Sequence, residues 1–223
     1  MKKVAFIAFF LVSMGELIAI TTDVSFLHHL CKPLITVTLF LYYWNASAGN
    51  RSNSVSLAIL FSFAGDALLM YESRNTNYFV FGLIAFLLAH VFYILAYRQH
   101  RGERSEDELQ GVQRARLAFP IILAGSGLVF VLYPSLGDFK VPVILYAVVL
   151  VLMVLYALFR LGRTTPSSFW LAFTGAVLFM VSDSVLAINK FFIPIPHASF
   201  YIMVTYITAQ YLIVNGMIRH FTK

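Results

Sequence analysis

The chain has 223 residues, of which 60% are hydrophobic and only 12% charged, and its mean hydropathy is +0.82. A soluble domain is about half apolar and about a quarter charged, so this composition excludes an ordinary soluble protein and indicates an integral membrane protein. One cysteine, Cys31, excludes an internal disulfide, and the net charge of +6 lies in short loops, which gives no reason to expect a nucleic-acid partner.

Eight apolar runs follow one another along the chain, and each can cross a bilayer, which takes about 20 helical residues. The first run resembles a signal peptide, but it carries Glu16 and lacks a small-residue cleavage site, which predicts a retained helix. The fold is therefore predicted to be all-α, a polytopic membrane protein of eight transmembrane helices that form a single transmembrane domain over residues 1–223. The predicted spans are 4–22, 33–48, 54–72, 77–97, 117–134, 141–160, 168–189 and 198–218.

The basic residues of the loops predict the orientation, because cytoplasmic loops carry an excess of Lys and Arg. With the N-terminus inside, twelve of the 16 basic residues fall in inner segments, so both termini are expected in the cytoplasm. The membrane is the inner (plasma) membrane if the source is bacterial. The loop over 98–116 is rich in Arg and Glu and is predicted to be a solvated connector. The twelve inner residues are Lys2, Lys3, Arg51, Arg98, Arg101, Arg104, Arg114, Arg116, Arg160, Arg163, Arg219 and Lys223.

Two aspartates, Asp66 and Asp183, lie inside apolar spans. A charge at membrane depth costs about 3 kcal/mol on insertion scales, so such a residue usually has a function. Counting about 1.5 Å per helical residue places both aspartates about six residues below the outer ends of their spans. The same count places three further polar residues at nearly this level: Glu16, Tyr146 and Tyr206.

Two lysines, Lys32 and Lys190, are expected at the outer rim above this layer. Lys190 follows Asp183 by two helical turns and therefore lies on the same helix face. Gln210 is one turn deeper than Tyr206 on one face. The lysines have an alternative interpretation as interfacial anchors. A functional role of Glu16 stands equally beside a structural one, in which Glu16 snorkels to the interface or forms a structural pair.

The cluster of His28, His29 and Cys31 is a weak indication of a metal site, because adjacent histidines in a loop with one cysteine do not form a typical ligand set. No metal or other cofactor is expected.

Short motifs are spread over nearly the whole chain: Lys32-Pro33-Leu34, Gly65-Asp66-Ala67-Leu68-Leu69, residues 86–93, Ser182-Asp183-Ser184, Asn189-Lys190, and Tyr206 with Gln210. In these motifs the chain resembles the lysoplasmalogenase family, the YhhN-like membrane proteins. The resemblance implies an eight-helix hydrolase that cleaves the vinyl-ether bond of lysoplasmalogens to a fatty aldehyde and glycerophosphoethanolamine or glycerophosphocholine. The proposed catalytic pair of that family matches Asp66 and Asp183. Substrate contacts are expected from Lys32, Tyr146, Asn189, Lys190, Tyr206 and Gln210.

Two carboxyl groups in an apolar layer suit this chemistry. A vinyl ether hydrolyses through protonation of its β-carbon, which requires one carboxylic acid and one carboxylate, the division of roles that glycosidases use. Serines flank Asp183 and could stabilise its anion, whereas small apolar residues flank Asp66, so we expect Asp66 to be the acid and Asp183 the base. The substrate is expected to be a lysophospholipid with one alkenyl chain, entering from membrane lipid, with its phosphate near Lys32 and Lys190.

Two other functions remain open from the sequence. Paired intramembrane carboxylates also form proton or cation relays, so a small proton- or cation-coupled transporter is the alternative to the hydrolase. A third possibility is a structural or lipid-binding membrane protein in which the aspartates only join helices. The oligomeric state is left open.

Overall fold

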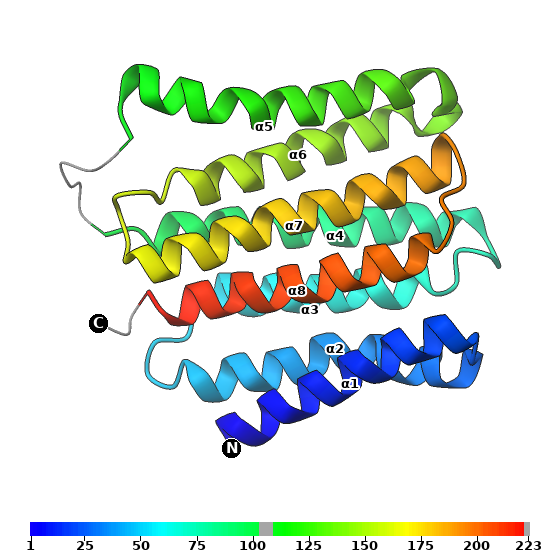
Figure 1. The fold of residues 1–223 in the computed structure, drawn as a ribbon, viewed down its shortest axis with the longest axis horizontal. Helices are drawn as coiled ribbons and strands as arrows, with labels where there is room; N and C mark the ends of the chain where they lie inside the picture. Colours follow the sequence, from blue (N-terminus) through cyan, green and yellow to red (C-terminus); the bar gives the residue numbers. More distant parts are fainter. Residues whose placement is uncertain (103–108, 221–223) are drawn as a thin grey trace. The chain divides into compact units, whose positions relative to one another are not determined.

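A computed structural model describes residues 1–102 and 109–220. Within these ranges the chain forms eight α-helices and two short 3₁₀ turns and no β-strand, so the all-α prediction is confirmed (Figure 1). The helices are α1 (Lys2–Thr22), α2 (Ser25–Ala46), α3 (Asn53–Leu69), α4 (Thr76–Gln99), α5 (Gly111–Leu132), α6 (Lys140–Leu158), α7 (Pro166–Phe191) and α8 (Ala198–Ile218), with 3₁₀ turns η1 (Tyr133–Ser135) and η2 (Gly137–Phe139).

Six segments are long and apolar enough to cross a membrane, and the chain is a multi-pass integral membrane protein. They contain α1, α4, α5, α6, α7 and α8, whereas α3 is a shorter apolar helix. The helix α2 has 22 residues but is less apolar, because its first half carries His28, His29 and Lys32.

The largest difference from the predicted spans is the start of α2. This helix begins at Ser25, eight residues before the predicted start at 33, and Pro33 lies inside it. The prediction was wrong because polar residues and a proline were interpreted as a loop, although a proline removes only one helical hydrogen bond. Lys32 therefore lies two turns inside α2, and His28 and His29 are helical.

Both ends of the connector that was predicted over 98–116 also differ from the prediction. The helix α4 extends to Gln99 and α5 begins at Gly111, so the described connector is shorter at both ends than predicted. Residues 103–108 of this predicted connector lie outside the described residues.

The chain divides into two compact units, Met1–Tyr93 and Ile94–Lys223, and each is described by itself. In the first unit α1 packs along α2, and α2 packs on α3 (Figure 1). The helices α3 and α4 approach closely at Gly65, where an added Cβ would lie 2.5 Å from the ring of Phe86. A glycine next to Asp66 is therefore needed for this contact, as small residues are at helix interfaces in membranes.

In the second unit α7 packs along α8, and α6 lies between α5 and α7 (Figure 1). The α7–α8 contact is close because Gly216 faces Ala172, and an added Cβ at Gly216 would lie 2.7 Å from the backbone nitrogen of Ala172. One turn away, the Ser168 hydroxyl donates a 2.6 Å hydrogen bond to the Gly216 carbonyl. Backbone packing and a buried hydrogen bond thus fix these two helices at one end.

Arg160, directly after α6, is fully buried at this end of the second unit. Its guanidinium donates to the His100 carbonyl at 3.1 Å, to the Ser168 hydroxyl at 2.8 Å and to the Ser168 carbonyl at 3.4 Å. Burial lowers the pKa of His100 to about 4, so this imidazole is neutral at pH 7 and adds no second charge beside the guanidinium. Arg160 therefore joins the end of α4 to α6 and α7 by hydrogen bonds.

Candidate active site

Asp183 lies in the C-terminal half of α7, and the Tyr146 hydroxyl of α6 donates a hydrogen bond to it. The distance from the Tyr146 hydroxyl to Asp183 Oδ2 is 2.5 Å, the short range of a hydrogen bond to an ionised oxygen. Tyr146 is buried, at 8% exposure. The structure thus brings together two of the residues that the helical rise placed at one level, and they come from neighbouring helices.

The two serines beside Asp183 donate their hydrogen bonds to backbone carbonyls and not to the Asp183 carboxylate. Ser182 donates to the Ile202 carbonyl of α8 at 3.0 Å, and Ser184 donates to the Met180 carbonyl of its own helix at 2.6 Å. Each hydroxyl has one proton to donate, so neither stabilises the Asp183 anion in this arrangement. The sequence-based reason for that stabilisation was wrong, and Tyr146 is the donor instead.

Tyr206 and Gln210 form a second buried polar pair, one turn apart on α8. Gln210 donates from Nε2 to the Tyr206 hydroxyl at 3.2 Å. The Tyr206 ring meets Phe179 of α7 edge to face, with ring centroids 5.4 Å apart. Phe179 precedes Asp183 by one helical turn, so this contact between α7 and α8 lies one turn from Asp183 along α7.

Asp66 is buried in α3, at 3% exposure, within the first unit. One turn earlier, the fully buried Ser62 donates to the Ala58 carbonyl of its own helix at 2.9 Å. Its neighbour Gly65 makes the close contact with Phe86 of α4. Asp66 is thus a buried carboxyl group next to the contact between α3 and α4.

The polar residues that were predicted near the outer rim, Lys32, Asn189 and Lys190, differ in their exposure. Lys32 is half-buried inside α2, whereas Asn189 and Lys190 are exposed in the last turn of α7. The Asn189 side-chain oxygen accepts a 2.9 Å hydrogen bond from the backbone nitrogen of Ile195 and so holds the turn between α7 and α8. Asn189 therefore has a structural role in addition to any contact with substrate.

Glu16 forms a pair that the sequence did not reveal. It is fully buried, and its Oε1 lies 2.8 Å from Nδ1 of His28, on α2. Its Oε2 has no hydrogen-bond partner in the described part of the chain. The structural interpretation of Glu16, that it forms a pair, is thus confirmed. His28 was missed as a partner because the early start of α2 was not predicted. Within the described residues, no group of three His, Cys, Asp or Glu side chains is arranged to hold a metal.

Comparison with known proteins identifies relatives over most of the chain. The model of the YhhN family matches residues 27–217. The human proteins named lysoplasmalogenase TMEM86A and TMEM86B are 31% and 32% identical, over 85% of this chain and over 76% and 74% of their own lengths. A lysoplasmalogenase of Mycobacterium bovis is 36% identical over 71% of this chain and 58% of its own length. No solved structure matches the chain.

Proposed function

Because the chain belongs to the YhhN family, we propose that it is a lysoplasmalogenase, an enzyme that hydrolyses the vinyl-ether bond of a lysophospholipid with one alkenyl chain. The products are a fatty aldehyde and glycerophosphoethanolamine or glycerophosphocholine. The observation that carries this proposal is the similarity to proteins of that name over most of the chain. The hydrogen bond from the buried Tyr146 to the half-buried Asp183 supports it, because the chemistry calls for a stabilised carboxylate.

The reaction begins with proton transfer from a carboxylic acid to the β-carbon of the vinyl ether, which gives an oxocarbenium ion. Water adds to this cation and loses a proton to a carboxylate, and the resulting hemiacetal collapses to aldehyde and alcohol. We assign Asp66 as the acid, because it is buried and small apolar residues flank it in the sequence. Asp183 is the base, and its charge also stabilises the cation. No net charge is created, since the proton lost by one group is regained from the other through solvent and product.

Tyr146 supports the role of Asp183, because a hydroxyl that donates to a carboxylate stabilises the charged form. Tyr146→Phe removes this donor and keeps the ring, so we expect kcat to fall about 10- to 100-fold, the factor that one hydrogen bond to a charged group provides. Tyr201→Phe is the matched control, since Tyr201 lies on α8 and is half exposed. Steady-state aldehyde release by both purified variants tests this, and an unchanged kcat in Tyr146→Phe would show that Asp183 works without this donor.

The polar residues at the outer ends of the helices complete the proposed substrate site. Lys32 and Lys190 provide ammonium groups for the phosphate, because an ammonium ion binds a phosphate oxygen through charge-assisted hydrogen bonds. Asn189 contributes an amide beside Lys190. Tyr206 and Gln210 line the deeper part of the site as a buried polar pair.

The proposed topology has eight transmembrane helices in one domain, with both termini in the cytoplasm. It rests on the distribution of the 16 basic residues. We expect single cysteines introduced at Gly49 and Gly111, in a background that lacks Cys31, to react with an impermeant maleimide only after the membrane is opened. A cysteine at Gly137 should react in intact cells. Labelling of residue 111 from outside would reverse the topology.

Aldehyde release from a lysoplasmalogen by the purified protein in detergent is the direct test of the function. A lysophospholipid with a saturated ether chain is the control substrate, because it has no double bond to protonate and should release nothing. Proton or cation flux in proteoliposomes without aldehyde release would support the transporter alternative and overturn the proposal.

A further inference from the structure

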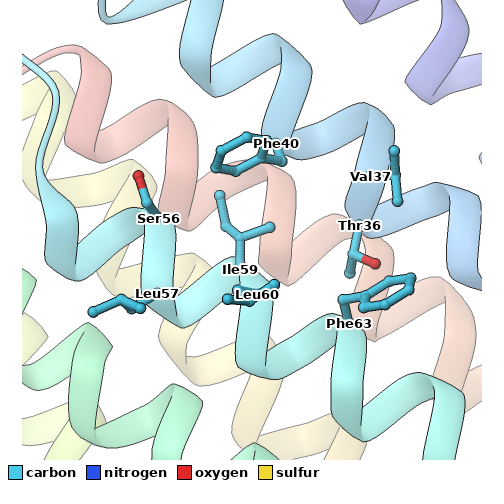
Figure 2. Close-up of a pocket in the computed structure, with 8 residues that line it drawn as sticks. All are labelled: Thr36, Val37, Phe40, Ser56, Leu57, Ile59, Leu60 and Phe63. Carbon is cyan, nitrogen blue, oxygen red and sulfur yellow. The ribbon is translucent and has the colours of Figure 1, made fainter.

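A groove with a volume of about 320 Å³ lies between α2 and α3 in the first unit, and Figure 2 shows the side chains that form it. Two of these side chains are partly exposed at its edges, Val37 at 39% and Leu60 at 57%. Its floor contains the buried Ile59. The groove is therefore open on one side and closed by packed helices below. Its lining residues are Thr36, Val37, Phe40, Ser56, Leu57, Ile59, Leu60 and Phe63.

The wall of the groove is apolar in its chemistry. Its two hydroxyl groups donate within their own helices, Thr36 to the Pro33 carbonyl at 3.1 Å and Ser56 to the Ser52 carbonyl at 3.2 Å. A ligand in the groove therefore meets almost entirely hydrocarbon surface. Such a surface fits an alkyl or alkenyl chain and offers no donor for a head group.

The groove leads toward the candidate acid. On α3 the lining residues Ser56, Ile59 and Phe63 follow helical spacing, and Asp66 continues the same stripe one turn beyond Phe63. The lined part of α3 is about 10 Å long, by the rise of 1.5 Å per residue. One end of the groove thus lies within a helical turn of a buried carboxyl group.

The same end carries a cation. On α2 the lining residues Thr36 and Phe40 are preceded by Lys32 at the same four-residue spacing. In Figure 2 Thr36 lies beside Phe63, and Phe40 lies farther along, near Ile59. The helices α2 and α3 therefore run in opposite directions along the groove. Lys32 precedes Thr36 and Asp66 follows Phe63, so Lys32 and Asp66 lie beyond the same end of the groove.

We infer that the groove between α2 and α3 binds the single hydrocarbon chain of the substrate, with the vinyl ether at the Asp66 end and the phosphate at Lys32. This inference rests on the proposed function and adds the residues that select the chain. The order of groups in a lysophospholipid is phosphate, glycerol, vinyl ether and chain. The phosphate and the vinyl ether are thus at one end of the lipid, as Lys32 and Asp66 are at one end of the groove.

Binding is tested apart from hydrolysis with a photoreactive lipid. The probe is a lysophospholipid with a saturated ether chain that carries a diazirine near its end, used with the purified full-length protein in nanodiscs. We expect crosslinks in residues 36–40 and 56–63, identified by mass spectrometry. The crosslinks should disappear with excess unlabelled ether lysophospholipid and persist with excess two-chain phospholipid.

Groove-filling variants give a second measurement. Val37→Trp places a large ring at the edge of the groove, and Leu41→Trp places the same ring one turn away on α2, at a residue that is 47% exposed and not part of the lining. We expect Val37→Trp to lower kcat/KM about tenfold for a long alkenyl chain and less than twofold for a short one, the penalty that overfilling a packed site imposes. Leu41→Trp should leave both values unchanged.

The outcomes separate the inference from the function. Crosslinks elsewhere, or equal competition by two-chain phospholipid, would overturn the inference and show that bilayer lipid fills the groove. An equal loss for long and short chains in Val37→Trp would also overturn it. Crosslinks in the groove that lysolipid displaces, in a protein that releases no aldehyde, would retain the chain site and reject the hydrolase.

Discussion

Asp66→Asn and Asp183→Asn are each expected to abolish turnover while the protein still folds and inserts. Asparagine keeps the size of aspartate and most of its hydrogen bonds, but it cannot give or take a proton. General acid–base assistance alone contributes about 10² to 10⁴ in rate. Because the proposed mechanism has the two carboxyl groups act on one developing cation, we expect each loss at or beyond the upper end of that range. Aldehyde release by purified variants, at protein amounts matched by size-exclusion chromatography, measures it.

The double variant and a surface control make this test specific. The double variant should be little worse than either single variant, because groups that act as a unit lose their effect together. Asp138→Asn in the exposed 3₁₀ turn η2 should retain full activity. Near-normal activity of either Asn variant at position 66 or 183 would remove that residue from the mechanism and favour the helix-joining role.

Gly216→Val is expected to cause the largest loss of stability in the second unit. Even one added Cβ at this position would lie 2.7 Å from the Ala172 backbone nitrogen and 3.0 Å from the Ser168 carbonyl oxygen, and backbone atoms cannot rotate away. The helices α7 and α8 must separate, which also lengthens the hydrogen bond from Ser168 to the residue 216 carbonyl. Overpacking costs about 1 to 3 kcal/mol, and the loss of that buried bond adds about 1 to 3 kcal/mol.

Gly127 in α5 is the matched control, since an added Cβ there meets no atom within 4 Å. Gly127→Ala should leave the protein as stable as before, or more stable by up to about 1 kcal/mol, because alanine favours the helix. Thermal unfolding in detergent, followed by the loss of the monodisperse chromatographic peak, compares the two. Similar unfolding temperatures for Gly216→Val and the unaltered protein would show that the α7–α8 contact can open without cost.

The sequence was sufficient for most of the helices, because an apolar run of bilayer length has one stable conformation in lipid. Residues 198–218 were predicted as a span and form α8 with the same bounds. The start of α2 was missed for a physical reason: the polar residues that suggested a loop are satisfied inside the fold. His28 bonds Glu16 on α1, and His29 bonds the Ser25 carbonyl of its own helix.

The level of each site residue along its helix could be predicted from the sequence, whereas the hydrogen-bond partners of the two serines could not. The rise per residue placed Tyr146 and Asp183 at one level, and the two are in hydrogen-bond contact. The hydroxyl groups of Ser182 and Ser184 were assigned to the wrong acceptor. Ser184 donates to a carbonyl one turn back in its own helix, and Ser182 donates to a carbonyl of α8, which helix packing alone brings within reach.

The buried Arg160 has a consequence for synthesis of the chain. Its partners belong to residues 100 and 168, and Ser168 in turn needs the carbonyl of residue 216, at the end of the last helix. A nascent chain that stops before α8 therefore keeps an incompletely bonded polar junction at the end of α6. The junction is therefore complete only after α8 has packed against α7.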